Sequence, residues 1–349
     1  VYGRENVYDF SLGNPNVPVP QVTEAILDVV KNEDFMTLHG YMSNAGYEDV
    51  RQTIAESLNK RFGTNFSFKN LIMTVGAASG LNIILKSILN PGDEVIVFAP
   101  YFVEYNAYVR NYDGNVVVIS PDTETFMPKL DEFEAKITAK TKAVIINNPN
   151  NPTGRLIAND LLEEILRICR EKNIALFVDE CFLSLSDGGV DLTPSLSDVP
   201  QLFILKAFTK SFGMAGLRLG YGLSADEALL RKMSAAVPPW NVSTLAQAAG
   251  VAALGDAEFL EKNRTIIRAE RPWLEEKLRK FGFWVCPSQV NYILFRGDVG
   301  LMEQLRARGV AIRDCANFEG LTSGWYRVAV RQYEENEQLI AAIRSVGKE

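Results

Sequence analysis

Histidine is almost absent from this sequence of 349 residues, which contains only His39, and its four cysteines share no C-x-x-C spacing. One histidine excludes a metal site built from several imidazoles, and it leaves His39 as the only imidazole base for a Ser-His-Asp or Cys-His enzyme. The scattered cysteines fit neither a zinc site nor a disulfide framework. We therefore expect no metal, and a general base that is Lys, Asp, Glu or Tyr, or a cofactor that carries the difficult step.

The chain also lacks the segments that nucleic-acid and membrane proteins need. No Lys- or Arg-rich run occurs and the net charge is −7, which argues against a nucleic-acid partner. No apolar run approaches the ~18 residues of a membrane span. The first residues are polar and do not resemble a secretion signal, and the cysteines suit a reducing compartment, so we expect a cytoplasmic protein.

Short apolar runs alternate with helical patterns along much of the chain. Six runs are rich in Val, Ile and Phe and cover residues 70–75, 93–99, 115–120, 141–146, 174–180 and 202–208. Nearly continuous apolar runs are typical of strands that are buried on both faces. The alternation predicts an α/β fold with a mostly parallel sheet between helices, in which ligands bind beyond the carboxyl ends of the strands.

The pattern changes after Trp240. A long helical region over about 242–281 precedes two strand-like stretches, 283–295 and 325–330, and an amphipathic helix begins at Glu334. This indicates a second, smaller α+β unit, against which the proline-rich N-terminal arm is expected to pack. We predict a large domain over residues 36–250 and a small domain formed by residues 1–35 and 251–349.

The turns at the ends of the first predicted strands carry candidate binding residues. T-V-G-A-A-S-G (74–80) follows one strand and opens a helix, so its backbone N–H groups can approach a phosphate, although a plain tight turn has the same sequence. The small residues of this turn are Gly76, Ala77 and Ala78. Tyr101 follows the next strand, where an aromatic ring either stacks on a flat ligand or joins the core.

Three later strand ends carry an amide, an acid and an amine. Asn151 lies in N-N-P-N-N-P-T-G (147–154), which is either a turn or an uncharged platform for a ligand. Asp179 ends an apolar strand, where a carboxylate is costly unless a cation or a helix cap satisfies it. Lys210 follows the last strand among phenylalanines, and apolar surroundings ease the deprotonation that a Schiff-base amine requires. A solvated surface position is the alternative for Lys210.

Taken in order, N-P-T-G, V-D-E and T-K-S-F-G-M-A-G-L-R-L-G-Y resemble the fold-type I pyridoxal-phosphate enzymes, specifically the class I/II aminotransferase family. The resemblance covers nearly the whole chain and implies that residues 36–250 form the cofactor-binding domain. It implies that Lys210 forms a Schiff base with pyridoxal 5'-phosphate and later moves protons. Asp179 would pair with the pyridine nitrogen, and Asn151 would donate a hydrogen bond to the 3-oxygen of the ring.

The resemblance also implies the remaining contacts. Tyr101 would stack on the cofactor ring, and Tyr41 would reach the phosphate of the neighbouring subunit, which implies a homodimer. Arg327 would bind the α-carboxylate of the substrate, and Gly13 lies in the segment that closes over it. The phosphate would be held by Arg218 and by the backbone of Gly76, Ala77 and Ala78.

Two positions depart from the usual family pattern. Phe182 stands where family members often carry a tyrosine whose hydroxyl supports the 3-oxygen, and losing one hydrogen bond to a charged oxygen costs about 1.5–3 kcal/mol. We expect a raised pKa of the imine as a result. Ala207 stands where a phosphate-binding Ser or Thr is common, so backbone amides and Arg218 must hold the phosphate.

The interpretation we favour is an aminotransferase that moves an amino group between an amino acid and a 2-oxo acid. The stretch I-R-D-C-A-N-F-E-G-L (312–321) resembles the histidinol-phosphate aminotransferase and threonine-phosphate decarboxylase branch, in which Arg327 or Arg313 would bind a substrate phosphate. A decarboxylase is therefore the first alternative, and a β-lyase is a weaker one. A catalytically silent cofactor-binding relative and a nucleotide-binding α/β protein without pyridoxal chemistry also stay open.

Overall fold

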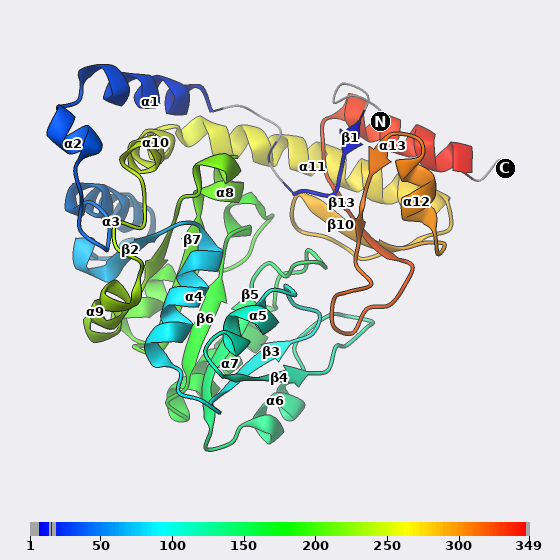
Figure 1. The fold of residues 1–349 in the computed structure, drawn as a ribbon. Coiled ribbons are helices and arrows are strands. Elements are labelled where there is room, and N and C mark those ends of the chain that lie inside the picture. Colours follow the sequence, from blue (N-terminus) through cyan, green and yellow to red (C-terminus); the bar gives the residue numbers. More distant parts are fainter. Residues whose placement is uncertain (1–6, 14, 16–18, 347–349) are drawn as a thin grey trace.

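The computed structural model describes residues 7–13, 15 and 19–346 (Figure 1). Its larger part is built on a seven-stranded sheet of order β2-β8-β7-β6-β5-β3-β4, in which only β8 is antiparallel to its neighbours. The mostly parallel α/β fold is confirmed, and the six predicted strands agree with the observed ends within one residue. The strands are β2 (Leu71–Thr74), β3 (Glu94–Phe98), β4 (Asn115–Ile119), β5 (Thr141–Asn147), β6 (Ala175–Asp179), β7 (Leu202–Ala207) and β8 (Gly220–Leu223).

Successive residues of the central strands point into two different cores, which explains their unbroken apolar sequences. In β3, Ile96 packs into one core, whereas Val95 and Val97 pack into the other. The first core is covered by α3 (Glu48–Phe62), α6 (Leu130–Lys136), α7 (Asn159–Glu171) and α10 (Thr244–Gly255). The second core is covered by α4 (Ala77–Ile88), α5 (Tyr105–Arg110) and α9 (Glu227–Ala236). The sheet is therefore buried on both faces, and its carboxyl edge remains for ligands.

The smaller unit is built on a four-stranded antiparallel sheet of order β12-β13-β10-β9. The predicted helical region 242–281 is divided at Asp256, whose side chain accepts the Phe259 N–H at 3.1 Å and so begins α11. The strands are β9 (Trp284–Val285), β10 (Tyr292–Arg296), β12 (Arg313–Asp314) and β13 (Trp325–Ala329). The helices that pack on this sheet are α11 (Ala257–Lys280), α12 (Leu301–Arg306) and α13 (Tyr333–Val346).

The described part of the N-terminal arm divides between the two units. β1 (Tyr8–Asp9) pairs in parallel with β11 (Val310–Ala311) of the smaller unit. In contrast, α1 (Pro20–Asn32) packs against α10, because Val22 and its apolar neighbours join the core beneath that helix. The predicted grouping of residues 1–35 with the C-terminal unit thus describes β1 but not α1. Residues 1–6, 14 and 16–18 lie outside the described residues, and the domain boundaries stay a prediction.

Among the residues that the structure describes, no helix has the length and apolarity to cross a bilayer. The same residues contain no group of three or more His, Cys, Asp or Glu side chains placed to hold a metal ion.

Candidate active site

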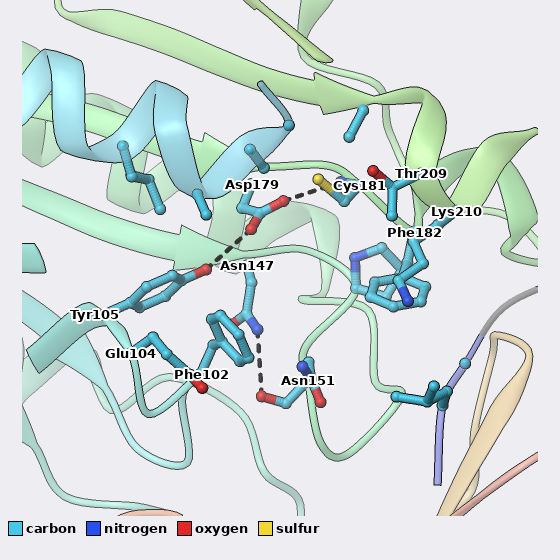
Figure 2. A pocket seen from close by; sticks show the side chains of 18 of the residues that line it. Phe102, Glu104, Tyr105, Asn147, Asn151, Asp179, Cys181, Phe182, Thr209 and Lys210 are labelled. Carbon is cyan, nitrogen blue, oxygen red and sulfur yellow. Dashed lines mark hydrogen bonds between the residues drawn. The ribbon is translucent and has the colours of Figure 1, made fainter. Parts of the chain in front are cut away.

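A cavity of about 590 Å³ lies where the carboxyl edge of the large sheet meets the smaller unit. Residues that follow or end β2, β5, β6 and β7 form its floor, α5 and the smaller unit form its walls, and residues 11–13 form part of its rim. Figure 2 shows Asn147, Asp179 and Lys210 of the floor together with Tyr105 of α5. Of the residues predicted from the sequence, the cavity brings together Gly13, Gly76, Ala77, Ala78, Asn151, Asp179, Phe182, Ala207, Lys210, Arg218, Arg313 and Arg327.

One end of the cavity is a cradle for an anion. Gly76 precedes α4 with a φ of 82°, and a Cβ at that position would lie 3.1 Å from Nη2 of Arg218. Arg218 itself has a φ of 56°, and its two terminal nitrogens donate to the carbonyl oxygens of Val75 and Ala215, both at 3.2 Å. A fixed guanidinium thus faces the N-terminus of a twelve-residue helix, an arrangement that suits a phosphate.

No hydroxyl is present at position 207, as the sequence indicated, and the methyl group of Ala207 lines the cavity. Thr209, which the sequence reasoning did not select, lines the same cavity one residue before Lys210. Its hydroxyl makes no hydrogen bond to another described residue, so it is able to contact a ligand in this cavity.

Asp179 lies at the end of β6 with both carboxylate oxygens engaged. Oδ1 accepts the Cys181 N–H and Oδ2 accepts the Tyr105 O–H, each at 3.1 Å (Figure 2). Burial raises the pKa of Asp179, and no described Lys or Arg forms an ion pair with it. The internal salt bridge that was one reading of this acid is therefore not formed. A cationic ligand group, such as a protonated pyridine nitrogen, would compensate the buried charge.

Lys210 lies in the short helix α8 (Phe208–Ser211) and its side chain enters the cavity. Its Nζ is 5.5 Å from the centroid of the Phe182 ring (Figure 2). Burial, and after it the positive charges of Arg327 and Arg218, lower the pKa of Lys210 to about 8. A substantial fraction of the amine is thus neutral near physiological pH, which nucleophilic attack on a carbonyl requires.

Asn151 and Arg327 come from opposite units and meet in the cavity. One terminal nitrogen of Arg327 donates to Oδ1 of Asn151, and the other donates to the carbonyl oxygen of Ser11 at 2.9 Å. Because a guanidinium only donates, the Asn151 carbonyl oxygen faces Arg327 and its amide N–H groups remain for an acceptor elsewhere. The Arg327 guanidinium also lies over the Tyr292 ring, 5.2 Å from its centroid.

The other asparagines of the 147–154 turn build the turn itself. Asn147 donates to the Asn151 carbonyl oxygen at 3.3 Å, and Asn150 donates to Oδ1 of Asn147 at 3.1 Å. The smaller unit fixes the turn from outside, since the Tyr292 hydroxyl donates to the Asn150 carbonyl oxygen at 2.8 Å. The turn reading therefore holds, because the turn is tightly bonded, and Asn147 and Asn151 also line the cavity. The reading as a platform for a ligand stays a prediction.

Gly13 lies at the rim, in the segment expected to cover the substrate. Its carbonyl oxygen accepts the side-chain N–H of Asn291 at 3.1 Å. A Cβ on Gly13 would lie 3.4 Å from both Phe182 and Tyr292, so the segment passes close over these two rings. This places residues 11–13 between the two units.

The structure does not bring Tyr101 or Tyr41 into the cavity. Tyr101 is 2% exposed and its hydroxyl donates to Asn106, whereas the neighbouring Phe102 lines the cavity. The turn after β3 directs Tyr101 into the core beside Tyr105, so the aromatic ring that lines the cavity is that of the next residue, Phe102. Tyr41 is 81% exposed and stacks on Trp240 with ring centroids 3.9 Å apart.

Comparison with known proteins shows matches over almost the whole chain. Residues 4–343 match the family model described as aminotransferase class I and II. Histidinol-phosphate aminotransferase 1 of Archaeoglobus fulgidus is 33% identical over 336 residues, which cover 95% of this chain and 97% of that protein. Threonine-phosphate decarboxylase of Salmonella typhimurium is 35% identical over 227 residues, or 62% of this chain and 60% of that protein.

Solved structures give the same result. Aspartate aminotransferase from Thermus thermophilus with maleate superposes with a TM-score of 0.86 at 28% identity, covering 98% of this chain and 91% of that one. The histidinol-phosphate aminotransferase from Clostridium acetobutylicum superposes with a TM-score of 0.86 at 26% identity, covering 98% of this chain and 99% of that one.

Proposed function

The chain belongs to the class I and II aminotransferase family, whose cofactor is pyridoxal 5'-phosphate, and we propose that Lys210 is the amine that binds this cofactor covalently during amino-group transfer. The donor would be an amino acid and the acceptor a 2-oxo acid. The observation that carries the proposal is the lowered pKa of Lys210, about 8, in the same cavity as Asp179 and the anion cradle. When bound, the cofactor supplies an aldehyde that reacts with amines and a ring that accepts electrons.

Groups in the cavity would hold the three polar regions of the cofactor. The N-terminus of α4 at Gly76 and the Arg218 guanidinium would bind the phosphate. The Asp179 carboxylate would hold a proton on the pyridine nitrogen, and the Asn151 amide would donate to the 3-oxygen. Phe102 takes the stacking position that the sequence assigned to Tyr101.

Arg327 would bind the α-carboxylate of the substrate. It is buried, with 9% exposure, and already contacts Asn151, so the carboxylate would be held next to the group that contacts the cofactor. A carboxylate held there by Arg327 would stay with the protein, and Lys210 in the same cavity would take the proton from the substrate's Cα. This arrangement favours transamination over loss of the carboxylate.

A homodimer would complete the site. Tyr41 is exposed but its loop is fixed, because Asn44 donates to the Ser234 carbonyl oxygen and accepts the Trp240 N–H. Trp240, on which Tyr41 stacks, is 49% exposed, and Phe35 in α2 (Phe35–His39) is 70% exposed, so large apolar side chains are exposed in this part of the fold. A second copy that covers this surface would receive Tyr41 at its phosphate cradle.

A phosphate-bearing substrate is the second candidate, and Arg313 is the observation that favours it. Arg313 is the cross-strand partner of Arg327 in the β12–β13 pair, and both arginines line the cavity. One guanidinium could bind a carboxylate and the other a phosphate, as threonine phosphate, which carries both groups, would require. Histidinol phosphate carries a phosphate and no carboxylate, so it would need a guanidinium for its phosphate alone. Were Arg327 to take the phosphate instead, it would no longer hold the substrate carboxylate, and decarboxylation would be favoured.

Two further features stay proposals. The four cysteines are buried thiols without disulfide partners, which suits the proposed cytoplasmic location. The separation of the two sheets is consistent with a cofactor-binding domain over residues 36–250 and a small domain that includes residues 251–349 and β1, whereas α1 packs on the larger part.

The test compares Lys210→Ala with Lys172→Ala, which changes an exposed lysine at the end of α7. We expect the parent protein and Lys172→Ala to show the absorption band of protein-bound cofactor and to convert it to the amine form with an amino acid. Lys210→Ala should lose both signals. Release of CO₂ with recovery of the original band would instead identify a decarboxylase. Amino transfer by Lys210→Ala at the parent rate would contradict the proposal.

A further inference from the structure

Glu104 is a carboxylate in the wall of a cavity whose other charged groups are mostly cations. The described residues that line the cavity include four cations, Lys210, Arg218, Arg313 and Arg327. The second acid, Asp179, is enclosed, and both of its oxygens accept hydrogen bonds from the protein. Glu104 is therefore the acid in this cavity that the proposed chemistry does not use.

The structure gives Glu104 no local partner. It precedes α5, but its side chain does not cap that helix, and it forms no ion pair with any described cation. Glu104 is exposed. The pKa of Tyr108, on the same wall, is raised to about 12, first by the burial of Tyr108 and then by the negative charge of Glu104. A helix-capping or ion-pairing role, which would explain an acid here, is thus not observed.

Glu104 lines the same cavity as the residues assigned to the cofactor and to the substrate carboxylate. Figure 2 shows it beside Phe102, across the cavity from Cys181 and Thr209. The cradle, Asp179 and Asn151 account for the cofactor, and Arg327 accounts for the substrate carboxylate. The lining that these roles leave unassigned includes the apolar Leu12 and Phe318 and the charged Arg313 and Glu104.

We propose that Glu104 selects substrates by the charge at their distal end. It favours a side chain that carries a cation or an N–H donor and disfavours a second carboxylate at that place. The inference rests on the proposed function only in that Arg327 must hold the α-carboxylate. The expected substrates therefore do not include dicarboxylic amino acids, because an acid in a partly enclosed cavity repels a second anion.

The test measures equilibrium binding to the cofactor-loaded protein, so it does not depend on turnover. Three four-carbon acids serve as probes, namely butanedioate, butanoate and 4-aminobutanoate, which share one carboxylate and differ in the charge at the other end. Their dissociation constants are measured by calorimetry for the parent protein, Glu104→Gln and Glu104→Lys. The matched control is Glu319→Gln, an exposed acid near Tyr101 that does not line the cavity.

We expect Glu104→Gln to strengthen the binding of butanedioate and to weaken the binding of 4-aminobutanoate, each by about fivefold. The effect is modest because solvent partly screens Glu104. Glu104→Lys should enlarge both changes, and butanoate should stay within about twofold throughout. Glu319→Gln should match the parent protein. Equal changes for all three probes, or none, would overturn the inference. Absence of amino transfer together with the expected binding pattern would contradict the proposed reaction alone.

Discussion

Removal of the Lys206 ammonium should destabilise the fold more than any single surface charge. Lys206 Nζ contacts Glu180 at 2.5 Å and Asp191 at 2.7 Å, on the face of the sheet opposite the cavity. The side chains are 13%, 0% and 18% exposed, respectively. Lys206→Met keeps most of the apolar stem but leaves two acids facing each other without a cation. Loss of one member of a buried ionic group costs about 3–5 kcal/mol.

This cost converts into a measurable shift of the melting temperature. The entropy of unfolding is about 2.1 cal/mol/K per residue, or roughly 0.7 kcal/mol/K for the 349 residues. A loss of 3–5 kcal/mol then lowers the melting temperature by about 4–7 °C. The control is Lys262→Met, which removes an exposed partner of Glu258 at 3.2 Å and should change the melting temperature by less than about 1 °C.

The pH dependence provides a second signature. Burial raises the pKa of Glu180 to about 7 even though Lys206 opposes this shift. A carboxyl whose pKa is raised on folding stabilises the fold at low pH, and this contribution is lost as the pH rises through 7. Without Lys206 the pKa of Glu180 should rise further. The loss of stability in Lys206→Met, relative to the parent protein, should therefore shrink as the pH is lowered from 8 to 5. A deficit equal to that of Lys262→Met, or one independent of pH, would refute the reasoning.

Three other predictions concern the cavity. Tyr105→Phe removes one of the two donors to the carboxylate that ends β6 and should weaken cofactor retention about tenfold in dialysis, whereas Tyr101→Phe should not. Gly76→Ala should weaken cofactor binding by about tenfold in a fluorescence titration, since the new Cβ requires a strained positive φ and meets a guanidinium. A mixture of the inactive variants Tyr41→Ala and Lys210→Ala should recover activity through mixed dimers, and no recovery would contradict a shared site.

The residues at strand ends could be predicted because parallel strands present their carboxyl ends at one edge. Asp179 is the last residue of β6, and Asn151 and Lys210 follow β5 and β7, which flank β6 in the sheet. The alternation of side chains along a strand also separates neighbours, so Asp179 faces the cavity whereas Glu180 faces the opposite core. These relations need only the strand positions and the parallel order.

The residues that the sequence did not reveal depend on turns and on distant contacts. Tyr101 and Phe102 are adjacent aromatics after β3, and a turn has no periodicity that decides which ring points inward. Tyr105 reaches Asp179 from a helix of six residues, a contact across 74 positions of the chain. Sequence patterns report local geometry, so a contact of this kind requires the folded structure.

The absence of a hydroxyl at Phe182 gives Arg327 two roles. With a phenylalanine there, the 3-oxygen of the cofactor would depend on the Asn151 amide, whose carbonyl oxygen accepts a hydrogen bond from Arg327 and whose N–H groups are left for another acceptor. A neutral substitution of Arg327 would therefore remove the carboxylate partner and release the amide at once. Either loss would weaken substrate binding in such a variant. A changed cofactor spectrum before any substrate is added would reveal the release of the Asn151 amide, whereas an unchanged spectrum would assign the weaker binding to the lost carboxylate contact.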